Sequence, residues 1–142
     1  MPRIFPAGAS VEALQQASIN TLAQTLGIQI TEIGEDYLRA SMPVDHRTCQ
    51  PTRILHGGAS VALAETLASV AANLVVNRDH WLCVGQEINA NHLRRAPEGS
   101  VVTGTARAFH LGARSQVWGV EICDGRGQRI CVSRVTMAVV KR

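Results

Sequence analysis

Residues 56–69 read HGGASVALAETLAS and largely decide the fold expected of this chain of 142 residues. Between Arg53 and Arg78 there is one formal charge, that of Glu65. Such a stretch predicts a helix from Gly57 to Val76 that is apolar on every side, and helices of this kind are normally buried. A carboxylate is costly to bury without a partner, so Glu65 is the strongest pointer to chemistry in the chain.

Alternating apolar residues on both sides of this helix predict an antiparallel sheet. A helical stripe comes first, with Ser10 as its predicted N-cap and Gly27 at its end. Strands are then expected at residues 28–33, 37–44, 82–92, 101–111, 115–123 and 129–140. The predicted class is α+β, with one sheet wrapped around the long central helix and a second subunit completing the enclosure.

Composition limits the function classes. The chain is long enough for one domain, taken as residues 1–142 with an N-terminal helical extension at 1–27. Its net charge of +3 is too small to indicate nucleic acid binding but suits an anionic small ligand. No segment is expected to span a membrane, and the N-terminus lacks the apolar core of a secretory signal, so the cytoplasm is the expected location.

The four cysteines contain no CxxC pair and no Cys/His spacing typical of zinc sites. We therefore expect reduced thiols, no metal and no cofactor. The sequence DGRG at residues 124–127 lacks the third glycine and the following helix of a phosphate-binding loop, and is expected to close a hairpin.

The His56-Gly57-Gly58 corner is a candidate oxyanion hole. The first amides of a helix have no acceptor within the helix, and the helix dipole makes this end partly positive. Glycines let a substrate carbonyl approach those amides closely, as acyl transfer requires. The alternative interpretation is a tight turn into the helix with His56 as a capping residue.

Glu65 and Ser69 are four residues apart and share a helix face. The carboxylate could attack an acyl carbon or activate a water for that attack, with Ser69 orienting either one. The structural alternatives are a buried ion pair for Glu65 and close helix packing for Ser69. Arginines at strand ends, with His92 and His110, form either a phosphate-binding rim or ordinary solvated termini; these are Arg94, Arg95, Arg107 and Arg114.

Several segments together resemble the hotdog-fold acyl-CoA thioesterases. They are MPVD at 42–45, RT at 47–48, QP at 50–51, LHGGASV at 55–61, LAE at 63–65, Ser69, EINANH at 87–92, HLG at 110–112 with Arg114, and QVW at 116–118. The resemblance is to the phenylacetate-related and Arthrobacter-type 4-hydroxybenzoyl-CoA thioesterase branch, which includes 1,4-dihydroxy-2-naphthoyl-CoA hydrolases and enterobactin proofreading thioesterases. It covers residues 28–140.

This resemblance implies dimers, often paired into tetramers, with active sites at the dimer interface. It implies Glu65 as nucleophile or general base and, from the other subunit, the Gly57 amide as the donor that polarises the carbonyl. Matching positions further imply that Gln50 and His56 orient the thioester and the thiolate, that Ser69 lies near the attacking water, and that His92, Arg94 and Arg114 bind the coenzyme A nucleotide. The chain departs from the family pattern at Cys49 and Arg95, neither of which is expected to be catalytic.

The predicted function is hydrolysis of an aromatic or medium-chain acyl-CoA to the free acid and coenzyme A. The predicted assembly is at least a homodimer and is expected to be a homotetramer, without nucleic acid or membrane partners. Alternatives are a hotdog hydratase or dehydratase and a non-catalytic acyl-CoA binding module. The sequence leaves open the acyl group, coenzyme A against an acyl carrier protein, dimer against tetramer, and an anhydride intermediate against direct attack by water.

Overall fold

The computed structural model describes residues 2–142, and its longest helix, α3, spans Gly57–Val75, within one residue of the prediction. His56 is its N-cap. The helix is not buried on all sides, which corrects the expectation. One face packs on the sheet, whereas Glu65 on another face is exposed. The buried residues recur every three or four positions, as one helix face requires: Ala59, Ser60, Leu63, Ala64, Leu67, Ala68, Ala71 and Ala72.

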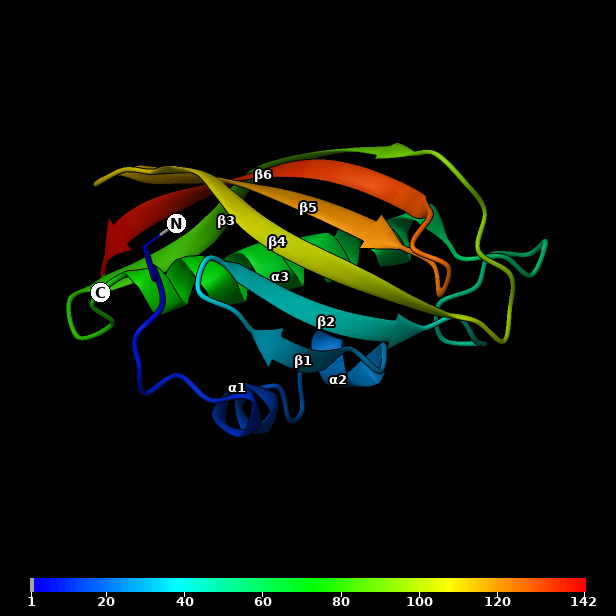
Figure 1. Cartoon of the computed structure of the whole chain (residues 1–142), viewed down its shortest axis with the longest axis horizontal. Coiled ribbons are helices and arrows are strands. Elements are labelled where there is room, and N and C mark those ends of the chain that lie inside the picture. Colours follow the sequence, from blue (N-terminus) through cyan, green and yellow to red (C-terminus); the bar gives the residue numbers. More distant parts are fainter. Residues whose placement is uncertain (1) are drawn as a thin grey trace.

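Helix α3 bears on the expectation that no segment spans a membrane. By length and composition alone it is apolar enough to cross a membrane, and 44% of its most apolar window is buried inside the protein. Contacts with five strands of the sheet account for that apolarity, because the sheet wraps around the helix (Figure 1).

All six predicted strands are present, each close to its expected limits. They are β1 (Gln29–Ile33), β2 (Tyr37–Pro43), β3 (Trp81–His92), β4 (Val101–Leu111), β5 (Ser115–Cys123) and β6 (Arg129–Lys141). They form one antiparallel sheet in the order β1-β2-β4-β5-β6-β3, and the sheet curves around α3 (Figure 1). The predicted α+β fold, an antiparallel sheet wrapped around one long helix, is confirmed.

The core lies between the sheet and α3, and β5 shows how the sequence builds it. Trp118, Val120 and Ile122 alternate along this strand and are all buried, as strand geometry dictates. The indole of Trp118 donates a hydrogen bond to Gln116 Oε1 at 2.8 Å, which satisfies two buried polar groups at once. Phe5 stacks on Trp118, so the N-terminal segment closes part of the core.

The N-terminal segment contains two short helices where one continuous stripe was expected. Helix α1 (Val11–Ala17) begins at the predicted N-cap Ser10, and α2 (Leu22–Thr25) is followed by Gly27 at φ 74°. Between them Asn20 adopts φ 61°. The Ser18 and Thr21 hydroxyls donate to the carbonyls of Leu14 and Ser18, and such local hydrogen bonds compete with helix propagation.

Strand β3 forms one edge of the sheet and is anchored to α3 by Asn73. The Asn73 side chain accepts from the Cys83 amide at 2.9 Å and donates to the Cys83 carbonyl at 3.0 Å. It therefore satisfies both backbone groups of one β3 residue, beside the helix that carries Glu65.

Replacing Asn73 with Ala should lower the free energy of unfolding by about 2 kcal/mol, because both Cys83 backbone groups lose their partner. Urea unfolding monitored by circular dichroism measures this change. Asn91→Ala on the exposed part of the same strand is the matched control and should stay within about 0.5 kcal/mol of wild type. Equal effects of the two substitutions would contradict the anchoring role of Asn73.

Candidate active site

The N-terminus of α3 has one amide available to a ligand. His56 Nδ1 accepts a hydrogen bond from the Gly58 amide at 2.8 Å, and the His56 carbonyl accepts from Ala59 and Ser60. Within residues 2–142 the Gly57 amide has no acceptor. His56 is therefore the helix cap, and the Gly57 N–H is the donor left at the positive end of the helix.

The imidazole of His92 lies against this corner. A Cβ built on Gly57 would come within 2.8 Å of His92 Nε2, so only glycine allows the ring this close to the helix end. His92 was predicted to bind a coenzyme A nucleotide, and the structure places its ring beside the candidate oxyanion donor of the same chain.

The loop before α3 is held by a cluster around Asp45. Both Asp45 carboxylate oxygens accept from the Arg47 guanidinium, which with the Arg47 amide lowers the pKa of Asp45 from 3.8 to about 2. The buried Thr48 hydroxyl donates to the Pro43 carbonyl. The Thr48 carbonyl accepts from the His56 amide at 2.8 Å, so this cluster fixes the position of the helix cap.

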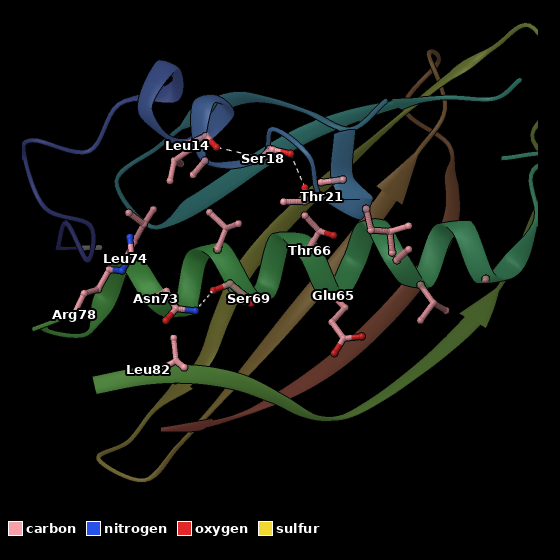
Figure 2. Close-up of a pocket in the computed structure, with 17 residues that line it drawn as sticks. Leu14, Ser18, Thr21, Glu65, Thr66, Ser69, Asn73, Leu74, Arg78 and Leu82 are labelled. Atoms are coloured by element: carbon pink, nitrogen blue, oxygen red, sulfur yellow. Dashed lines mark hydrogen bonds between the residues drawn. The ribbon is translucent and has the colours of Figure 1, made fainter. Parts of the chain in front are cut away.

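Glu65 and Ser69 line one groove of about 650 Å³ that runs along the uncovered side of α3. Residues of the N-terminal helices, including Leu14, Thr21 and Leu22, form its opposite wall. In Figure 2, Thr66 points toward Thr21, whereas Glu65 extends toward the β3 side. Glu65 and Ser69 were predicted to share a helix face, and in the structure both line this groove.

The carboxylate of Glu65 lies directly against the backbone of β3. A Cβ built on Gly85 would be 2.2 Å from Glu65 Oε1, far inside an ordinary contact distance. Gly85 therefore leaves room for the carboxylate. Sequence reasoning missed Gly85, although a glycine inside a strand is a known signal of a bulge or a close approach.

The remaining predicted residues are not gathered around Glu65 in one chain. Gly57 and Glu65 are eight residues apart on one helix, about 12 Å at the α-helical rise. Gln50 folds onto its own loop, where its Oε1 accepts from the amide and hydroxyl of Thr52. A carbonyl bound at Gly57 is therefore out of reach of Glu65 of the same chain.

His92, Arg94 and Arg114 do not form one cluster either. His92 pairs with Cys131 on β6, and Arg94 follows it, whereas the Arg114 carbonyl accepts from Val139 near the other end of β6. Cys131 and Val139 are eight residues apart in sequence, which is about 26 Å along a strand. Within residues 2–142 no group of three or more His, Cys, Asp or Glu side chains is arranged to hold a metal ion.

Comparison with known proteins identifies relatives along almost the whole chain. The model of the thioesterase superfamily matches residues 53–131. A proofreading thioesterase, EntH of Cronobacter turicensis, is 49% identical over 131 residues, which are 92% of this chain and 94% of that protein. A 1,4-dihydroxy-2-naphthoyl-CoA hydrolase of Escherichia coli is 47% identical over 92% of this chain and 95% of its own length.

The fold is shared with solved thioesterases. A crystal structure of a mutant thioesterase from Pseudomonas aeruginosa superimposes with a TM-score of 0.95 at 43% identity, covering 98% of this chain and 99% of the other. The sheet and central helix described above are thus those of a thioesterase along their full length.

The lowered pKa of Asp45 predicts an acid-sensitive loop. Because the folded-state pKa lies below the unfolded value, the contribution of Asp45 to stability is fully present above about pH 4 and is lost as the pH falls toward 2. Asp45→Asn should remove this part of the pH dependence, and Arg47→Ala should remove most of it. Urea midpoints measured between pH 7 and pH 2 provide the test, and parallel curves for wild type and Asp45→Asn would disprove it.

Proposed function

Because the chain belongs to the thioesterase superfamily and is a thioester hydrolase, we propose that it hydrolyses acyl-CoA, with Glu65 and the Gly57 amide as its catalytic groups. The observation that carries this proposal is the position of Glu65, a lone carboxylate in a groove with largely apolar walls. Coenzyme A as the carrier is supported by the printed name of the Escherichia coli relative.

In the proposed mechanism the Gly57 amide donates a hydrogen bond to the thioester carbonyl oxygen. Negative charge develops on that oxygen as the carbonyl carbon becomes tetrahedral, and the positive helix end stabilises it. Glu65 then acts in one of two ways. Its carboxylate attacks the carbon, expelling the thiolate and forming an anhydride that water hydrolyses, or it takes a proton from a water that attacks directly.

The other site residues have supporting roles in this proposal. Ser69, one helical turn from Glu65, orients the attacking water. His56 Nδ1 is occupied as an acceptor, so the proton of the neutral ring is on Nε2, from where it can be donated toward the departing thiolate. Gln50 keeps its side-chain N–H groups for the thioester, because its Oε1 is the atom engaged by Thr52.

We propose that two chains complete each active site. The separation of about 12 Å between Gly57 and Glu65 supports this, since one thioester carbon cannot meet both groups of the same helix. A second copy would supply Gly57 opposite Glu65, in a homodimer that pairs further into a tetramer. The free edge of β3 offers backbone groups for such an association.

The proposed acyl group is aromatic or medium-chain. The groove volume lies within the range of small-molecule sites, and Val61, Val70 and Leu82 are among its apolar walls. His92, Arg94 and Arg114 are proposed to bind the nucleotide of coenzyme A, with contributions from both chains because the arginines lie at opposite ends of the sheet. The cytoplasm is the proposed location, and the four free thiols fit a reducing compartment.

Glu65→Ala should lower the rate of thiol release by about 10²–10⁴-fold without unfolding the protein. The assay uses a thiol-reactive dye with benzoyl-, hydroxybenzoyl-, phenylacetyl-, hexanoyl- and palmitoyl-CoA, and circular dichroism monitors folding. Glu121→Ala on the outer face of the sheet serves as control and should keep wild-type activity. A Glu65→Ala enzyme that retains a tenth of wild-type turnover would refute the proposed role of the carboxylate.

Mixing two inactive variants tests the shared site. Gly57→Pro removes the amide, and the first helical position tolerates proline because His56 already has an extended ψ of 132°. The proline Cβ would meet the His92 ring, which is exposed and can turn away, so His92→Ala is measured beside it to isolate the effect of losing the amide. After subunit exchange with Glu65→Ala, half of the dimers have one intact site, so about one quarter of wild-type activity should return. Activity that stays at the level of the separate variants would contradict a site built from two chains.

A further inference from the structure

Strand β3 contains a β-bulge that changes which residues face α3. Gly85 pairs with Met137 and Glu87 pairs with Thr136, so Gln86 is an extra residue with no counterpart on β6. Before the bulge Cys83 is buried and Gly85 lies against Glu65. After it the inward residues are Ile88 and Ala90, which pack on the core.

Without the bulge, the strict alternation of a strand would direct Glu87 and Asn89 toward the helix. In the structure both are exposed, and the Asn89 side chain donates to the Glu87 carboxylate. The extra residue also directs His92 inward, where its ring meets Gly57. Strand β3 thus meets α3 at two places, before the bulge where Gly85 lies against Glu65 and after it where His92 lies against Gly57.

We propose that Gly85, the last paired residue before this bulge, is a positioning residue that fixes the Glu65 carboxylate in its reactive orientation. This inference rests on the proposed function, since it assigns the position of the proposed catalytic group. It goes beyond it by naming a residue that touches Glu65 without taking part in the chemistry.

Contact distances support this role. A methyl group on Gly85 would stand 2.2 Å from Glu65 Oε1, 3.3 Å from Cδ and 3.7 Å from Cγ. Only the carboxylate tip conflicts, so a rotation that moves the oxygen by about 1 Å relieves the contact. The strand can stay where it is, because Asn73 holds Cys83 two residues earlier. We therefore expect the added methyl group to move the carboxylate of Glu65 and to leave the backbone of β3 in place.

The test is the Gly85→Ala enzyme assayed for acyl-CoA hydrolysis. A misplacement of about 1 Å should lower kcat about 100-fold with little change in KM, while the unfolding midpoint and the oligomeric state stay those of wild type. Gly125→Ala is the matched control, because a Cβ there meets nothing within 4 Å, and it should keep wild-type kcat.

A double-substitution cycle separates positioning from a general structural effect. Glu65→Asp has a carboxylate one methylene shorter, whose oxygens need come no nearer to the added methyl group than Glu65 Cδ does, at 3.3 Å. Adding Gly85→Ala to Glu65→Asp should therefore change kcat by about twofold at most. An equal fold-loss in both backgrounds overturns the inference, as does a crystal structure of Gly85→Ala with the Glu65 carboxylate unmoved.

The outcomes also distinguish this inference from the proposed function. An inactive Glu65→Ala enzyme together with wild-type kcat in Gly85→Ala would refute the positioning role alone. Full turnover by Glu65→Ala would refute the catalytic carboxylate, and the positioning role with it.

Discussion

Burial of one face of α3 against a curved sheet is the constraint on which the rest of this structure depends. Leu63 and Leu67 are fully buried there, and removing such side chains from water is the dominant favourable term in folding. Once that face is buried, the helix periodicity determines the direction in which every other side chain of α3 points. Glu65 and Ser69 must then lie along the groove, and Gly57 must lie at the end of the same rigid element.

That rigidity explains why one chain presents two separated halves of a candidate site. The rise of an α-helix keeps the backbones of Gly57 and Glu65 about 12 Å apart, which is farther than a glutamate side chain extends. The position of each group is therefore also set by residues outside α3. The loop that contains Asp45 and Thr48 holds the helix cap His56 by a hydrogen bond, whereas Gly85 lies against the carboxylate of Glu65. A helix placed by the core thus has its candidate catalytic groups in contact with segments that are distant in sequence.

Much of this architecture could be predicted from sequence because its signals are local. Strand limits follow from alternation and from turns such as residues 124–127, where Asp124 Oδ1 accepts from the amides of Arg126 and Gln128 and closes the expected hairpin. The start of α3 follows from the glycines after His56. The prediction was wrong for residues 11–26, because Ser18 and Thr21 hydrogen-bond the local backbone and break a helix that the apolar spacing alone allows.

By itself the sequence determined the elements, their order and the identity of Glu65 as the unusual group, since periodicity and a lone charge are properties of neighbouring residues. The tertiary structure alone decided which face of α3 remained open, that His92 meets Gly57 while Arg114 lies at the opposite end of the sheet, and that Gly85 meets Glu65. The contacts of Gly85 and His92 with α3 depend on which residues of β3 face the helix. The extra residue Gln86 makes the later residues of β3 face the side opposite to the one that strict alternation predicts. No local sequence pattern specifies which strand lies beside which helix face.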